Sequence, residues 1–454
     1  MSLSAPVNQT EPPGTTPEPR VASLVSFWRN PSAWLREQNL GRGYWVFFTA
    51  AFFLDAGFAV YHFLFNLYLL DLRFNERTMG MLGGAMTLGS LTGTLPAGVL
   101  ARKIGLRPLL LVCFVVAPLL QASRVVWMWP TAQIGLAFLA GLAMSSWGVC
   151  FLSAVARLTT EKNRTSAFSL IASMSIGTSA LGGVVCGYLP QWLRMAGLVM
   201  QPAEVKRLIL VAACGIVMIG LLPVLHLRMP LSSQEDIPAG GQPTRGGWFR
   251  GWKFPPFLLR FLPSMALWTA VAASFNPFAN VYLSRVLHIP MTRIGLIFST
   301  TQIVQLCLGL LTPLIFRALG LVNGIVATQI ATAVALASLA GARDERLAVV
   351  LYLCSSAAQW MSAPGLYNLL MTETPDKERT TAAAMTMFCN ALAASVATAG
   401  AGILFTRFGY THVLLGIAAL ALAVATLFRL IVTPQKLRSG LAAIGENVLP
   451  LHAE

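Results

Sequence analysis

Two short segments of the chain repeat each other at a distance of 215 residues. Residues 161–167 (EKNRTSA) match residues 376–382 (DKERTTA), and the same offset carries Gly105 onto Gly320. A register kept over so long a distance exceeds any helical periodicity and indicates that one folded unit occurs twice. Each copy lies among long apolar runs, so we expect the repeated unit to lie in a membrane.

The composition agrees with a membrane fold. Of the 454 residues, 56% are hydrophobic and only 11% are charged, and the mean hydropathy is +0.67. A helix needs about 20 mostly apolar residues to cross a bilayer, and twelve segments of the chain qualify. We therefore expect an all-α membrane protein whose twelve transmembrane helices form two pseudo-symmetric six-helix bundles. The expected spans are residues 43–70, 78–101, 107–128, 131–156, 165–188, 206–227, 257–284, 291–316, 321–340, 346–370, 381–405 and 410–433.

Polar stretches divide the chain into five parts. Residues 1–42 combine a Pro- and Thr-rich tail with an interfacial segment, and residues 434–454 form a second polar tail. Between the bundles, residues 228–256 are rich in Gly and Pro, which is typical of a linker. We expect the two bundles at residues 43–227 and 257–433.

The basic residues indicate an orientation in the membrane rather than a nucleic-acid partner. The net charge is +15, but the 32 Lys and Arg residues are spread over loops between apolar segments and form no single stripe. Most of these basic residues lie on one side of the membrane if both termini are placed on that side. By the positive-inside rule we expect cytoplasmic N and C termini, a cytoplasmic linker and a location in the cell (inner) membrane.

The repeat extends into the first span of each half. Asn66 and Tyr68 match Asn280 and Tyr282, here at an offset of 214 because the following loop differs by one residue. Span 1 therefore corresponds to span 7, and each half has six spans. Such halves lie parallel, related by an axis along the membrane normal.

The loop after span 2 identifies a family resemblance. Residues 98–107 (GVLARKIGLR) are similar to the Gly-x-x-x-Asp-Arg-x-Gly-Arg-Arg/Lys signature of the major facilitator superfamily (MFS), and the chain resembles this family over nearly its whole length. The chain departs from the signature at Arg102, where the family usually has Asp. The resemblance implies two helical bundles around a central cavity that opens alternately to each side. It implies no particular substrate.

The resemblance also implies a gate at the cytoplasmic loops, which latch the two halves together in one state. Gly105 and Gly320 would permit a tight reversal between helices, and matched basic and acidic residues would pair across the loops. The alternative is that these charges form surface ion pairs worth about 0–1 kcal/mol each. The candidate gate residues are Gly98, Arg102, Gly105, Glu161, Arg164, Arg317, Gly320, Asp376 and Arg379.

A carboxylate lies about midway along the first span. Burying Asp55 there costs at least about 2.5–3.5 kcal/mol, so it should face a cavity or a partner. His62 and Asn66 follow at helical spacing and share its face. In the alignment of the two halves, Asp55 corresponds to Thr269 and His62 corresponds to Asn276. The titratable pair therefore occurs in the first half only.

This asymmetry favours a role in proton coupling or substrate binding for Asp55, His62 and Asn66. The alternative is an interhelical hydrogen bond from Asp55 that only fixes packing. Further polar and aromatic residues within spans could line the same cavity: Trp147, Trp268, Asn276, Asn280, Gln302, Gln305, Gln359 and Tyr367.

The polarity of this set suggests a moderately apolar organic solute, which can be cationic. A strong anion would call for Arg or Lys near the midplane, and none is expected there. Arg124 lies close to Trp127 and Trp129 at the outer end of span 3, so we expect its side chain to extend to the interface.

The sequence does not predict an enzyme. It has no Walker-type glycine loop, no Gly-x-Ser-x-Gly and no His/Cys/Asp cluster with ligand spacing, so we expect no cofactor and no metal. We expect a monomeric secondary active transporter that moves a small organic solute by alternating access, coupled to a proton or another cation. An uncoupled facilitator of the same fold and a non-transporting membrane scaffold or sensor remain as alternatives.

Overall fold

The computed structural model describes residues 40–197, 200–227, 256–375 and 378–432, and these fold almost entirely into helices. The interfacial segment before residue 40, most of the linker and the C-terminal tail lie outside the described residues. Within the described part, ten helices are long and apolar enough to cross a membrane.

The first half runs through six passes. Its helices are α3 (Arg42–Asp71), α4 (Glu76–Ile104), α5 (Leu106–Leu111) continued by the π segment η1 (Val112–Val116) and α6 (Ala117–Val126), α7 (Pro130–Leu158), α8 (Glu161–Met195), and α9 (Pro202–Ile219) with α10 (Leu221–His226).

The second half follows the same plan. Its helices are α11 (Pro256–Phe275) continued by the 3-10 turn η2 (Asn276–Phe278) and α12 (Ala279–Arg285), α13 (Met291–Leu319), α14 (Leu321–Gly341), α15 (Glu345–Glu373) and α16 (Arg379–Ile431).

The all-helical membrane fold is confirmed, whereas the count of twelve spans is confirmed only in part. Ten helices meet the criteria of length and hydropathy, and α4 is not among them. The last two predicted spans fall within α16, where Gly409 has φ 73° and breaks the helical conformation. This break lies between the predicted spans 381–405 and 410–433.

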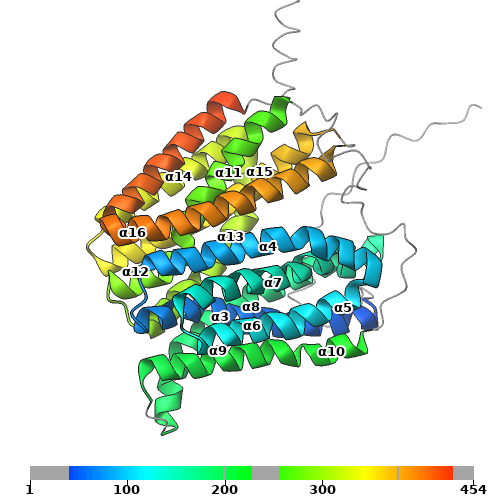
Figure 1. Cartoon of the computed structure of the whole chain (residues 1–454). Coiled ribbons are helices and arrows are strands. Elements are labelled where there is room, and N and C mark those ends of the chain that lie inside the picture. The colour runs from blue at the N-terminus through cyan, green and yellow to red at the C-terminus, as the bar shows by residue number, and fades with distance from the viewer. Residues whose placement is uncertain (1–39, 198–199, 228–255, 376–377, 433–454) are drawn as a thin grey trace, which may run out of the picture.

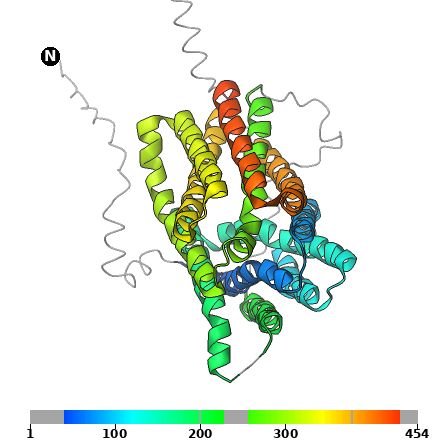
Figure 2. The same cartoon turned by 90° about the vertical axis from the view of Figure 1, so that its left-hand side faces the viewer.

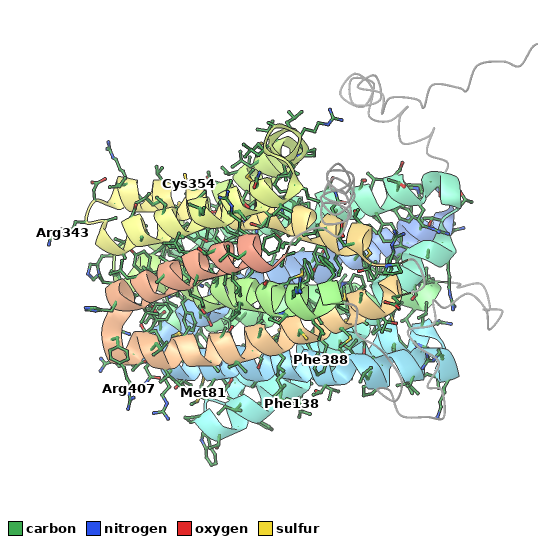
Figure 3. The ribbon with its side chains drawn as sticks, turned by 90° about the horizontal axis from the view of Figure 1, so that it is seen from above. Met81, Phe138, Arg343, Cys354, Phe388 and Arg407 are labelled. Atoms are coloured by element: carbon green, nitrogen blue, oxygen red, sulfur yellow. The ribbon has the colours of Figure 1, made fainter. Side chains whose placement is uncertain are left out.

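The two halves lie side by side, the first from blue to green and the second from green to red (Figures 1 and 2). Successive helices are antiparallel, so their connections fall at two opposite faces of the molecule. We call the end with Arg42, His226 and Ile431 the terminal face, and the end with the connections 71–76 and 285–291 the hairpin face. Arg343 and Arg407 project from the hairpin face (Figure 3).

The matched glycines Gly105 and Gly320 occupy equivalent turns on the terminal face. Gly105 joins α4 to α5 with φ 87°, and Gly320 joins α13 to α14 with φ 81°. A Cβ atom at either position would meet no atom within 4 Å. The requirement for glycine is therefore conformational, because side-chain-bearing residues rarely adopt positive φ.

The halves pack closely toward the hairpin face, where glycines let helix backbones touch. A Cβ on Gly295 of α13 would lie 2.3 Å from the carbonyl oxygen of Gly183 in α8. Similarly, a Cβ on Gly402 of α16 would lie 2.4 Å from the carbonyl oxygen of Glu76 at the start of α4. Small residues permit this close approach between membrane helices.

Toward the terminal face the same helices expose apolar side chains. Leu95 on α4, Leu310 and Leu314 on α13, and Phe388 on α16 are all more than half exposed, and Phe388 is visible in Figure 3. In Figure 1, α16 and α4 lie close together at the hairpin face and diverge toward the terminal face.

Candidate functional site

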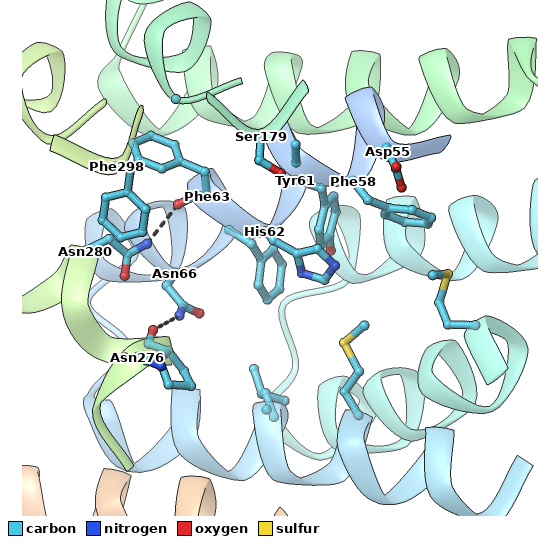
Figure 4. A pocket seen from close by; sticks show the side chains of 18 of the residues that line it. Asp55, Phe58, Tyr61, His62, Phe63, Asn66, Ser179, Asn276, Asn280 and Phe298 are labelled. Atoms are coloured by element: carbon cyan, nitrogen blue, oxygen red, sulfur yellow. Dashed lines mark hydrogen bonds between the residues drawn. The ribbon is translucent and has the colours of Figure 1, made fainter. Parts of the chain in front are cut away.

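A cavity of about 580 Å³ lies between the halves, lined from both. Figure 4 shows its interior, with side chains of α3 facing those of η2, α12 and α13. Its volume falls within the usual range of small-molecule sites, which is about 300–1,000 Å³. The predicted site residues that line it are Asp55, His62, Asn66, Trp147, Asn276, Asn280 and Gln302.

Asp55 is partly buried at one end of this cavity and bonded across the first half. The hydroxyl of Ser175 on α8 donates a hydrogen bond to Oδ2 of Asp55. No other hydrogen bond to the Asp55 carboxylate joins it to the described residues. The carboxylate thus keeps acceptor capacity for a proton or a cation in the cavity.

His62 points into the middle of the cavity (Figure 4). Its side chain is exposed to the cavity, and its ring lies 5.9 Å from that of Phe58 and 6.1 Å from that of Tyr61. Neither ring nitrogen bonds to another of the described residues. The imidazole can therefore donate to a bound solute or accept a proton from it.

Asn66 and Asn280 form a reciprocal clasp between the halves. Asn66 Nδ2 donates to the carbonyl of Pro277 at 2.6 Å, and Asn280 Nδ2 donates to the carbonyl of Phe63 at 2.8 Å (Figure 4). Pro277 lies three residues before Asn280, and Phe63 lies three residues before Asn66, so the two hydrogen bonds are equivalent. The pair therefore obeys the internal symmetry, and both amides are engaged in joining the halves.

A break in the helix supplies one of these acceptors. Pro277 has no backbone N–H and cannot bond to the carbonyl of Ala273, one turn earlier. The Thr398 hydroxyl on α16 donates to that carbonyl instead, at 3.1 Å. The chain then passes through the 3-10 turn Asn276–Phe278, and the Pro277 carbonyl is left to accept from Asn66.

Arg124 departs from the expected interfacial position. Its side chain is only 3% exposed and lines the cavity. The guanidinium lies 4.4 Å from the centre of the Phe65 ring, and Nη1 donates to Oε1 of Gln121 at 2.7 Å. The cavity therefore contains a cation that the sequence analysis did not assign to it.

The internal repeat, once its register is fixed by contacts in the structure, accounts for this placement. Tyr68 bonds to the carbonyl of Val125, and Tyr282 bonds to that of Leu339, at an offset of 214. The turn glycines that precede these carbonyls, Gly105 and Gly320, are 215 positions apart. Span 3 therefore contains one residue more than its counterpart, span 9. This extra residue lies in the π segment Val112–Val116. Such a segment turns the following side chains by about 100°, and an uninterrupted helical wheel then misplaces Arg124.

The remaining candidate cavity residues do not line this cavity. Gln359 accepts from Asn276 Nδ2 at 3.1 Å and so orients a cavity residue. Gln305 donates to Ser356 at 2.9 Å, Trp268 is buried in the second half, and Tyr367 is exposed.

The candidate gate residues that the structure describes lie at or near the terminal face. Arg102 and Arg317 are exposed beside the turn glycines, and Arg379 Nε donates to the carbonyl of Met371 at 2.8 Å. Arg164 is partly buried, and its Nε has no hydrogen-bond partner among the described residues. Gly98 has open space around it. Asp376 and the side chain of Glu161 lie outside the described residues.

On the hairpin face, a buried carboxylate joins the halves, which the sequence analysis did not anticipate. Glu76 at the start of α4 pairs with Arg285 at the end of α12 at 2.7 Å. The Tyr410 hydroxyl donates to the same Glu76 oxygen at 3.3 Å. Only 5% of the Glu76 side chain is exposed, against 54% of Arg285. These residues border a second, smaller cavity of about 320 Å³.

These features define an integral, multi-pass helical membrane protein with a polar cavity between two related bundles. The family model of the Major Facilitator Superfamily matches residues 46–398 and, again, 275–452. The chain belongs to the Major Facilitator Superfamily, and its transporter fold confirms the resemblance found in the sequence. No curated protein sequence matches the chain.

Solved structures of transporters share this fold. The nucleoside transporter NupG aligns with a TM-score of 0.70 and 16% identity over 86% of this chain and 99% of its own. A bacterial homologue of the human lysosomal transporter Spinster, in an inward-facing and unoccupied conformation, aligns with 0.69 and 12%, over 85% and 95%. A D-xylose-proton symporter aligns with 0.67 and 14%, over 86% and 98%.

Proposed function

We propose that the protein is a secondary active transporter that moves a small organic solute by alternating access, with proton coupling through Asp55. The observation that carries this proposal is the cavity itself: it lies between the halves, and it holds a carboxylate with a single hydrogen-bond partner among the described residues. A carboxyl in such a place can take up a proton from one side and release it to the other as access alternates.

The closed hairpin face supports the same proposal. If the terminal face is cytoplasmic, as the positive-inside rule predicts, the structure corresponds to an inward-open state. The glycine contacts and the Glu76–Arg285 pair then seal the outer side. The reverse state would require these contacts to separate and the terminal face to close, where the candidate gate residues lie.

His62 would assist Asp55 by binding the solute or relaying a proton. It supports this role that His62 lines the cavity between Asp55 and the Asn66–Asn280 clasp. We expect the cargo to be a small organic molecule and the site of action to be the cell (inner) membrane, with both termini in the cytoplasm and the protein acting as a monomer.

Reconstitution in liposomes tests the proposal. Proteoliposomes filled with pyranine would receive separate pools of sugars, nucleosides, amino acids and organic acids, with solute uptake followed by mass spectrometry. We expect one pool to be taken up together with protons, and Asp55→Asn to abolish the proton movement. Uptake without proton movement would indicate a facilitator, and no uptake from any pool would favour a scaffold or sensor.

A further inference from the structure

We propose that the solute is an organic anion, with a carboxylate on an aromatic or otherwise flat apolar body, and that Arg124 binds this carboxylate. The inference rests on the proposed transport function and identifies the class of its substrate. It reverses the expectation of a neutral or cationic solute, because that expectation assumed a cavity without a basic residue.

Arg124 is a buried cation without a counter-ion in the described part of the chain. Its polar contacts there are Gln121 Oε1 at 2.7 Å and the Met86 sulfur at 3.8 Å from Nη1. Nη2 makes no hydrogen bond to the described residues, and the buried Nε has no partner. An unpaired charge at such a position is costly, and an anion in the adjoining cavity would neutralise it.

The surrounding residues hold the guanidinium in place. The Tyr61 hydroxyl donates to the Gln121 carbonyl at 3.1 Å, and the Gln133 side chain donates to the Arg124 carbonyl. The Phe65 ring covers one part of the guanidinium. Gln121 and Gln133 are both fully buried. A cation fixed in this way, with Nη2 free of hydrogen bonds to the described residues, can donate to an oxygen of a bound carboxylate.

Asp55 is too distant to act as the counter-ion. Arg124 lies at the level of Phe65, which is ten residues beyond Asp55 on the same helix. At about 1.5 Å per residue, the two charges are separated by roughly 15 Å along the helix axis. The cavity is therefore basic at one end and acidic at the other, and both charges can act on different ions.

The wall between these ends is apolar and aromatic. Phe58, Phe63 and Phe298 line it, and the rings of Phe63 and Phe298 meet edge to face at 5.3 Å. Phe63 belongs to the first half and Phe298 to the second. A flat apolar body could pack against these rings while its carboxylate reached Arg124, and the cavity of about 580 Å³ has room for it.

Ligand-induced stabilisation of the purified full-length protein tests this proposal, because a ligand that binds the folded state raises its melting temperature. The probes are 2-naphthoate, its neutral amide and 2-naphthylmethylammonium, each at millimolar concentration. We expect naphthoate to bind at least about tenfold more tightly than the amide. Equal binding of the three probes, or no stabilisation by naphthoate, would overturn the proposal.

Two variants assign the effect to Arg124. Arg124→Gln should remove the preference for naphthoate, whereas Arg194→Gln, at an exposed position near the end of α8, should retain it. Gln121→Glu provides a second test in case Arg124→Gln does not fold. It places a carboxylate beside Nη1 of Arg124 and so supplies an internal counter-ion. This variant should fold and lose the preference. An unchanged preference in either cavity variant would contradict the proposal.

The result is separable from proton coupling. Asp55→Asn should still bind naphthoate in preference to the amide, since the two charges lie at opposite ends of the cavity. If Asp55→Asn keeps coupled proton movement while naphthoate binding depends on Arg124, only the coupling role fails. If coupling depends on Asp55 but naphthoate shows no preference, only the substrate class fails.

Discussion

The two halves share a fold but contribute differently to the cavity. The charged and titratable side chains come from the first half as Asp55, His62 and Arg124, whereas the second half contributes neutral ones such as Asn276 and Gln302. By contrast, the asparagine hydrogen bonds that join the halves are matched. The difference teaches that the asparagine contacts between the bundles follow the internal symmetry, while the charged side chains of the cavity do not.

The register of the repeat makes this comparison specific. At the offset of 214 fixed by the duplicated tyrosine bonds, Arg124 corresponds to Ser338 and Gln121 to Ala335. The π segment that precedes Arg124 in span 3 has no counterpart in α14, which is α-helical throughout. The site around Arg124 is therefore specific to the first half.

The largest effect should come from forcing the matched helices apart. Gly295→Ala would place a methyl group 2.3 Å from a backbone oxygen of α8, and overpacking of this kind costs typically about 1–3 kcal/mol. We expect a lower melting temperature and a more open hairpin face. Gly215→Ala is the matched control, because a Cβ there meets nothing within 4 Å; an equal loss in both variants would argue against the contact.

The buried carboxylate on the hairpin face should rank second. Glu76→Gln removes the charge that holds Arg285, and we expect the closed state to lose about 1–2 kcal/mol, because Arg285 is half exposed. Distances between spin labels at Arg77 and Arg407, in a cysteine-free background, would report the opening.

Glu345→Gln provides the control for that ion pair. Glu345 pairs with Arg293 at 2.9 Å, but both side chains are exposed and both belong to the second half. We expect no change in the spin-label distance and a stability effect of about 0–1 kcal/mol. An opening as large as that of Glu76→Gln would mean that general electrostatics, rather than the link between halves, holds the face closed.

The asparagine clasp should give the smallest effects, and they should be equal. Asn66→Ala and Asn280→Ala each remove one hydrogen bond between the halves, which contributes about 1 kcal/mol. The same spin labels should show the same shift toward the open state in both variants. If only Asn66→Ala alters solute binding and neither changes the distance, Asn66 is a solute contact and the symmetry is incidental.

The sequence was sufficient for the fold class, because the length of apolar spans and a repeated segment can both be recognised from the order of residues alone. It also placed Asp55, His62 and Asn66 on one face, and all three line the same cavity. Their roles stay predictions.

The remaining features depend on contacts that no local pattern encodes. Arg124 follows the pattern of an interfacial residue until the π segment and the packing of α3 turn it inward. Ser175 reaches Asp55 from another helix. The pairing of Glu76 with Arg285 joins residues more than 200 positions apart, at a face where the sequence analysis placed no gate.

The central claim is that one half carries the coupling group, and a matched pair of substitutions tests it most directly. Asp55 corresponds to Thr269, whose hydroxyl, within the described part of the chain, bonds only to the carbonyl of Met265 in its own helix. In pyranine-filled proteoliposomes with the solute pool that the wild type transports, we predict that Asp55→Asn abolishes proton movement and Thr269→Val leaves it intact. Coupled proton movement that survives Asp55→Asn, or is lost equally in both variants, would contradict the claim.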